Sequence, residues 1–66
     1  MSMTPEQIQE IARSFVQPLD RYARWSILTG GLAFTTYEEE LEAAHGVENL
    51  LAIKEAIYVE IRRAEA

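Results

Sequence analysis

Potential chemistry in this sequence centres on His45, its single histidine. Glu42 and His45 have a Glu-x-x-His spacing, which puts a carboxylate and an imidazole on one helical face, where a metal ion could bridge them. The motif has only these two members, and Gly46 follows immediately, so His45 is expected at a helix end rather than in a core. We therefore interpret His45 as a solvated surface histidine and expect no metal and no other cofactor.

Other catalytic groups are few. The chain has no cysteine, and neither Ser14 nor Ser26 can be placed near His45 by local spacing. A serine nucleophile needs a base and a third group that orients the base. Helical chains of this size also rarely enclose a pocket of roughly 300 Å³ or more. We expect a protein that is not an enzyme and has no substrate cavity.

The C-terminal segment, residues 49–66, is the clearest structural element. At roughly 100° per residue, an apolar stripe falls on one side of a helix that starts near Val47 or Asn49 and ends near Arg63. One neighbouring helix cannot cover an apolar arc of more than half the circumference, so we expect contacts with two or more elements, some of them from a second copy of the chain. The stripe consists of Leu50, Ile53, Ile57, Ile61 and Ala64, and it is widened by Val47, Leu51, Ala56 and Tyr58.

An N-terminal helix is predicted after residues 1–3, which we expect to be disordered. Thr4 is a suitable N-cap, Pro5 suits the first helical position, and Gln7 completes a capping box. One face of the helix is apolar over its whole length. This face consists of Ile8, Ile11, Ala12, Phe15, Val16, Leu19, Tyr22, Ala23 and Ile27.

Pro18 lies in the middle of this amphipathic pattern. Inside a helix, proline removes a hydrogen bond and costs about 3 kcal/mol. The apolar phase nevertheless continues across it, since Phe15 and Leu19 fall on the same face. We therefore expect one helix from about Pro5 to Thr29, kinked near Ser14, in preference to two helices joined by a turn.

The glycine pair at positions 30 and 31 is predicted to end this helix with a left-handed cap. Apolar residues surround the pair. They either fold back to close the end of the bundle or form an exposed contact surface, with the tryptophan as an interface anchor. The sequence leaves both alternatives open. The cluster consists of Trp25, Leu28, Leu32 and Phe34.

A short acidic helix is predicted next, capped by Thr35 or Thr36. A helix continued through Gly46 would put its apolar stripe opposite to that of the C-terminal helix, so a turn is expected at Gly46. The stripe consists of Tyr37, Leu41 and Ala44.

These elements predict an all-α fold in a single domain of residues 1–66. The domain is expected to be a small helical hairpin or three-helix bundle, completed by dimerisation. It contains a long kinked N-terminal helix, a short acidic middle helix and a long C-terminal helix.

Residues 37–53 share the outline of a helix-turn-helix: a short helix, a glycine-containing turn and a second helix. The pattern departs at Glu42, where a small residue would have to face the second helix. That helix would offer Glu48 and Glu55 to DNA against only Lys54, whereas base and phosphate contacts rely on arginine and lysine. A DNA-binding protein is therefore kept only as a remote alternative.

Charge and hydropathy limit the partners. Acidic residues outnumber basic ones by 11 to 6, and the net charge of −5 comes from residues 36–66. Such a field repels phosphate backbones, so nucleic acid is disfavoured as a partner. The chain has no uncharged apolar run long enough to span a membrane and no signal-peptide pattern at its N-terminus. We therefore expect a cytoplasmic protein without membrane contact.

Our leading hypothesis is a small acidic module for protein–protein interaction that forms a homodimer through its C-terminal helix. A chain of 66 residues without cysteine is marginally stable alone, and association is the remaining supplement. The predicted self-association residues are Leu51, Ile57, Tyr58 and Val59. Candidates for contact with another protein are Trp25, Leu28, Leu32, Phe34, Glu38, Glu39 and Glu42.

The alternative hypothesis is an acidic inhibitor or regulator. Its acidic band, from Glu38 to Glu48, would dock on a basic surface of a partner, including a surface that normally binds nucleic acid. Charge-led docking weakens as the ionic strength rises, whereas apolar docking does not, and this difference separates the two hypotheses.

Overall fold

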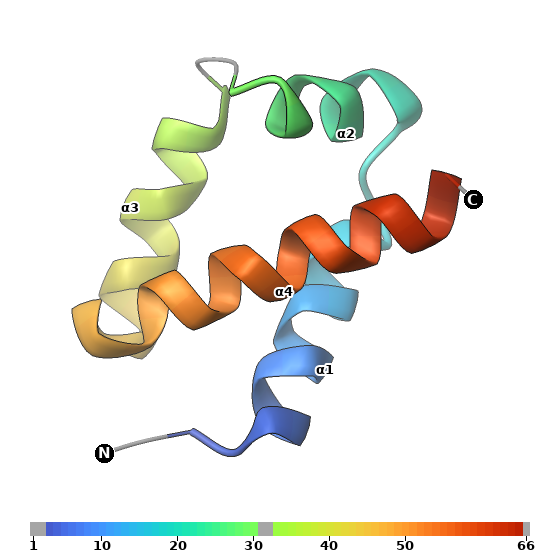
Figure 1. Cartoon of the computed structure of the whole chain (residues 1–66). Coiled ribbons are helices and arrows are strands. Elements are labelled where there is room, and N and C mark those ends of the chain that lie inside the picture. Colours follow the sequence, from blue (N-terminus) through green and yellow to red (C-terminus); the bar gives the residue numbers. More distant parts are fainter. Residues whose placement is uncertain (1–2, 31–32, 66) are drawn as a thin grey trace.

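The structure, a computed structural model, describes residues 3–30 and 33–65 of the chain (Figure 1). The described residues form helices only, which confirms the all-α class. Within these two ranges, four helices are present instead of the expected three. They are α1 (Pro5–Val16), α2 (Arg21–Leu28), α3 (Ala33–His45) and α4 (Val47–Glu65).

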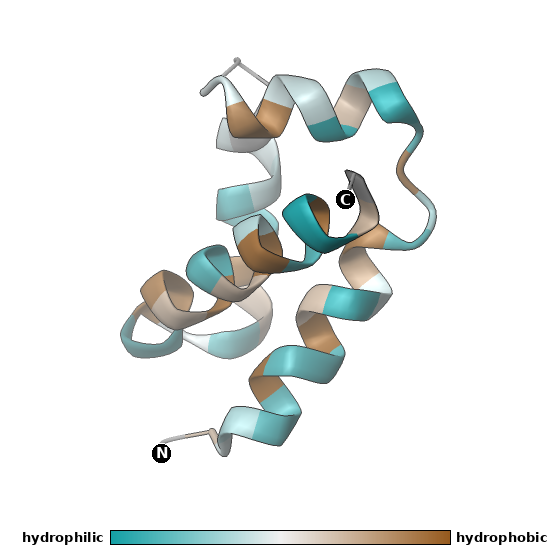
Figure 2. Ribbon diagram, turned by 45° about the vertical axis from the view of Figure 1, so that its right-hand side comes forward, coloured by the Kyte–Doolittle hydropathy of each residue, from teal (hydrophilic) through white to brown (hydrophobic). Residues whose placement is uncertain are grey.

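Helix α4 is the central element, because it packs against each of the other three helices. Figure 1 shows α4 crossing in front of α1, with α3 on one side and α2 across the top. Its inner face carries Ile53, Ile57 and Ile61, which are all fully buried, as the apolar stripe predicted. Hydrophobic and hydrophilic residues alternate along α1 and α4 in the manner of amphipathic helices (Figure 2). The core also includes Ala12, Val16, Ile27 and Leu41.

The chain breaks at Pro18, so the prediction of a single kinked helix was wrong. Helix α1 ends at Val16 and α2 begins at Arg21. Pro18 has no N–H to donate a helical hydrogen bond, and in a continuous helix its ring would clash with the carbonyl oxygen one turn earlier. The backbone N–H of Leu19 instead donates to the carbonyl of Val16 over 3.0 Å and closes a tight turn. Two helices joined by a turn, the alternative left open by the sequence, is the observed arrangement.

Asp20 starts the second helix. Its carboxylate oxygen Oδ1 accepts a hydrogen bond from the backbone N–H of Ala23 at 2.8 Å, in the manner of an N-cap. Arg24 then reaches back, and its Nε donates to the carbonyl of Leu19 over 3.1 Å. These two side chains satisfy one backbone group in the link and one in the first turn of α2.

The start of α1 agrees with the predicted capping box. The Thr4 hydroxyl accepts from the backbone N–H of Gln7 at 3.2 Å, and the Gln7 side-chain oxygen accepts from the N–H of Thr4 at 2.9 Å. Met3 was expected to be disordered with its two predecessors, but it is half-buried against the core. Residues 1 and 2 lie outside the described part of the chain.

The connection from α2 to α3 agrees with the prediction in part. Gly30 has a φ of 76°, the left-handed conformation expected of a helix-ending glycine. Helix α3 begins at Ala33, however, so Thr35 and Thr36 lie inside the helix and are not its N-caps. Gly31 lies outside the described residues.

The predicted turn at Gly46 is confirmed. This residue alone separates α3 from α4, and its φ of 87° is accessible to glycine at little cost. Asn49, from the first turn of α4, is buried and donates its side-chain N–H to the carbonyl of His45 over 2.8 Å. This hydrogen bond satisfies a carbonyl at the end of α3 and ties the two helices at their junction.

Candidate functional site

The side of α4 opposite the core is the first candidate surface. We define the outer face of α4 as Glu48, Leu51, Ala52, Glu55, Tyr58, Val59 and Arg62. Leu51 is 67% exposed and Val59 is 52% exposed. Tyr58 is half-buried and packs partly against the core. Three of the four predicted self-association residues therefore lie on this face.

Ile57, the fourth predicted self-association residue, does not lie there. It is fully buried within its own chain, between the inner side of α4 and the other helices. The prediction that Ile57 contacts a second copy was wrong, because α4 packs against α1, α2 and α3 and this side chain has no exposed surface left. Helix α4 is therefore sheltered over more of its circumference than expected, and the exposed apolar surface moves to Leu51 and Val59.

A second surface lies on α2. Tyr22 is 75% exposed and Trp25 is 60% exposed, and their ring centroids are 6.3 Å apart. Tyr22 was expected on the apolar inner face, but the break at Pro18 separates the orientation of α2 from that of α1. Trp25 thus supports the contact-surface alternative, whereas Leu28 is half-buried and packs against the core. Leu32 lies outside the described residues, and so does the side chain of Phe34.

The acidic residues of α3 divide into two groups. The Glu38 carboxylate lies 2.8 Å from Lys54 Nζ in an ion pair that joins α3 to α4. The hydrogen bond that the Lys54 ammonium donates to this carboxylate is the main cause that raises the pKa of Lys54, and partial burial opposes it. Glu38 therefore has a structural role. Glu39 and Glu42 are exposed, as the docking hypothesis requires.

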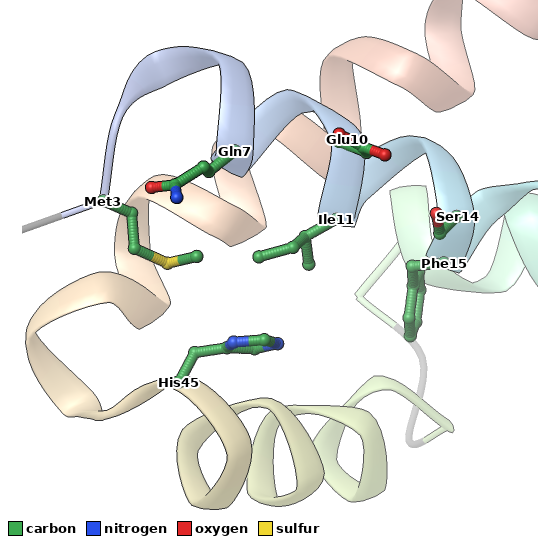
Figure 3. A pocket seen from close by; sticks show the side chains of 7 residues that line it. All are labelled: Met3, Gln7, Glu10, Ile11, Ser14, Phe15 and His45. Carbon is green, nitrogen blue, oxygen red and sulfur yellow. The ribbon is translucent and has the colours of Figure 1, made fainter.

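A pocket of about 610 Å³ lies between α1 and the end of α3. It is shallow and open to solvent, unlike the enclosed cavity of a typical small-molecule site. Figure 3 shows the His45 imidazole below Ile11 and Met3, while Glu10 and Ser14 lie farther along α1 and point away from it. No sequence pattern indicates this pocket, because helix packing alone brings its two sides together. The lining residues are Met3, Gln7, Glu10, Ile11, Ser14, Phe15 and His45.

The structure does not assemble the Glu42–His45 spacing into a metal centre. Glu42 is exposed to solvent, whereas His45 is half-buried beside the pocket. Within residues 3–30 and 33–65, no three His, Cys, Asp or Glu side chains are grouped closely enough to hold a metal ion. Over the same residues, none of the helices combines the length and the apolarity that crossing a bilayer requires.

Comparisons with known proteins give no family for this chain. No protein-family model matches it, and neither a curated protein nor a solved structure matches it significantly.

Proposed function

We propose that this chain is a non-enzymatic protein-interaction module that self-associates through the outer face of α4. The proposal is carried by one observation. After the core is complete, Leu51 and Val59 remain exposed on the outer face of α4, where Val59 also borders a groove lined by Pro5 and Ile8 of α1. Single exposed apolar side chains are common, but a group of them on one helix face is typical of an interface.

The size of the domain supports the same proposal. Seven small or medium-sized hydrophobic residues form the buried core of the described chain. A domain of this size is marginally stable, and burying more apolar surface stabilises it by roughly 25 cal/mol per Å². Association of two copies therefore has a thermodynamic benefit beyond any role in recognition.

The pocket between α1 and α3 does not favour an enzyme. Apolar residues Met3, Ile11 and Phe15 form part of its lining, and Glu10 and Ser14 point away from the imidazole of His45 (Figure 3). A nucleophile and its base must lie within hydrogen-bonding reach for covalent catalysis. Ser14 and Glu10 are turned away from His45 in Figure 3, and this orientation supports the non-enzymatic part of the proposal.

Sedimentation equilibrium at micromolar concentration tests the proposal. We expect a dimer, and we expect Leu51→Gln to weaken it by removing an apolar contact. The matched control is Trp25→Gln, which also replaces an exposed apolar side chain but does so on α2. A folded monomer at all concentrations would refute self-association, and equal weakening by both substitutions would refute the assignment to α4.

A second candidate function is docking of the acidic surface of α3 on a basic partner, as an inhibitor or regulator. It is favoured by the exposure of Glu39, Glu40 and Glu42, since the one lysine of the chain is already paired with Glu38. Binding of this kind depends steeply on ionic strength. Retention of a co-purifying partner at low salt and its loss at about 0.5 M salt would support docking by charge. Unchanged retention by Glu39→Gln/Glu42→Gln would exclude it. The same charges disfavour the DNA-binding alternative.

A further inference from the structure

We infer that two copies pair through antiparallel α4 helices, about a two-fold axis that passes next to Glu55. This inference rests on the proposed self-association and specifies its geometry. It follows from an internal symmetry of the outer face of α4, which is complementary to its own image after a half-turn.

The symmetry lies in the spacing of residues about Glu55. Leu51 and Val59 are four residues before and after it, which places them about 40° to either side on the helix circumference. Glu48 and Arg62 are seven residues before and after it, about 20° to either side. All five side chains are exposed. The face thus has an apolar residue and a charged residue on each side of one central position.

An antiparallel pairing centred on Glu55 places Leu51 of one copy at the level of Val59 of the other, and Glu48 at the level of Arg62. Leu51 of one copy then enters the hole between Tyr58 and Val59 of the second copy. Val59 of one copy likewise enters the hole between Leu51 and Ala52 of the second copy. This is the knobs-into-holes packing of paired helices, in which a side chain fits among four residues of the facing helix. The two holes consist of Glu55, Tyr58, Val59 and Arg62, and of Glu48, Leu51, Ala52 and Glu55.

Charge decides between the antiparallel and the parallel arrangement. In the antiparallel pair, Glu48 of each copy faces Arg62 of the other, which gives two favourable contacts at the ends of the interface. In a parallel pair, Glu48 would face Glu48 and Arg62 would face Arg62, and like charges opposed across an interface are unfavourable. Glu55 faces its own mate on the axis in both arrangements. It therefore weakens the dimer without selecting its direction.

A charge exchange tests this geometry in the full chain, with the dimer dissociation constant measured by sedimentation equilibrium at low salt. We expect Glu48→Arg and Arg62→Glu each to weaken the dimer by about tenfold, because each creates two like-charge contacts. The double variant Glu48→Arg/Arg62→Glu restores the opposite-charge contacts and should return to within about threefold of the parent. Glu55→Gln should tighten the dimer by about threefold, since it removes a repulsion on the axis.

The control for net charge is Glu39→Arg, which makes the same charge change as Glu48→Arg but on the exposed side of α3. It should leave the dissociation constant nearly unchanged. Helical content and thermal melting of each variant show that the monomer remains folded. Glu55→Gln leaves the helix ends untouched and so provides an independent result if a charge at a helix end disturbs folding.

Oxidative cross-linking gives a second readout, because the chain has no cysteine of its own. A mixture of Glu48→Cys and Arg62→Cys chains should form mixed disulfide dimers rapidly, whereas each variant alone should cross-link slowly. Faster cross-linking of Glu48→Cys with itself would indicate a parallel pair and overturn the inference.

The outcomes separate this inference from the proposed function. A monomeric parent chain would overturn both. A dimer that is weakened by Leu51→Gln but not restored by the double charge exchange would leave the proposed function intact and would refute the antiparallel pairing.

Discussion

Lys54 of α4 and Glu38 of α3 form an ion pair of 2.8 Å that closes the angle between two helices joined by a single glycine. Both side chains are largely shielded from solvent, since they are 26% and 34% exposed. The pair therefore has a structural role in addition to its effect on surface charge. The ion pair holds α3 against α4. The rings of Phe15 and Tyr37 make an edge-to-face contact, with centroids 4.9 Å apart, that holds α3 against α1.

The ion pair should contribute to stability in a pH-dependent way. Glu38 raises the pKa of Lys54 above its ordinary value of 10.5. A raised lysine pKa stabilises the folded state fully at pH values below 10.5 and loses this contribution as the pH rises through the folded-state pKa. We expect Lys54→Met to lower the free energy of unfolding by at most about 1 kcal/mol at pH 7, because solvent partly screens the pair.

Urea denaturation of Lys54→Met and of the parent chain at pH 7 and above pH 11 measures this effect. The difference between the two chains should shrink at the higher pH as the lysine loses its charge. Glu39→Gln, an exposed neighbour on the same helix, is the control and should have no effect. A difference that grows with pH would contradict the assigned role of Glu38.

Gly46 should tolerate no side chain without loss of stability. Its φ of +87° strains an L-residue, and an added Cβ would lie 3.0 Å from the Glu48 carboxylate. We expect Gly46→Ala to lower the free energy of unfolding by about 1–2 kcal/mol, as measured by urea denaturation. The matched control is Gly30→Ala, which has a φ of +76° but no atom within 4 Å of its Cβ. A larger loss at Gly30 than at Gly46 would show that contact with Glu48 is unimportant.

The N-cap at Asp20 should be needed for α2. We expect Asp20→Ala to destabilise the protein by about 1 kcal/mol, because the N–H of Ala23 loses its acceptor. Asp20→Asn keeps an acceptor oxygen and should recover most of the loss. Thermal unfolding followed by circular dichroism measures both. Equal destabilisation by the two variants would point to the charge of Asp20, not its hydrogen bond.

Ile57 and Leu51 should respond differently to protein concentration. Ile57→Val removes a buried methyl group and should cost about 0.5–1.5 kcal/mol at every concentration. Leu51→Ala shortens an exposed side chain, so it should lower the unfolding temperature only at concentrations where the parent chain is a dimer. Thermal melts over a hundredfold range of concentration test this. A concentration-independent loss at Leu51 would assign it to the monomer core.

The local features of the fold were predictable from the sequence. The capping box at Thr4, the turn at Gly46 and the inner stripe of α4 depend on residues only a few positions apart. Caps follow from hydrogen bonds within one helical turn, and a stripe follows from the 3.6-residue period. These signals therefore determined the start of α1, the α3–α4 junction and the buried face of α4.

The break at Pro18 shows where such signals fail. The apolar phase continued across it because the turn preserves the burial of Phe15 and Leu19 on the two sides. Periodicity alone could not distinguish this turn from a continuous helix. Because the helix breaks at Pro18, Tyr22 is exposed, although its place in the apolar pattern predicted burial.

By itself, then, the sequence determined the helical class, the caps and the inner face of the longest helix, since these depend on neighbouring residues. Only the tertiary structure decided that Glu38 pairs with Lys54, that Ile57 is enclosed by its own chain, and that a pocket opens beside His45. These relationships join residues far apart in the chain, and they depend on the angles at which the helices pack, which no local pattern specifies.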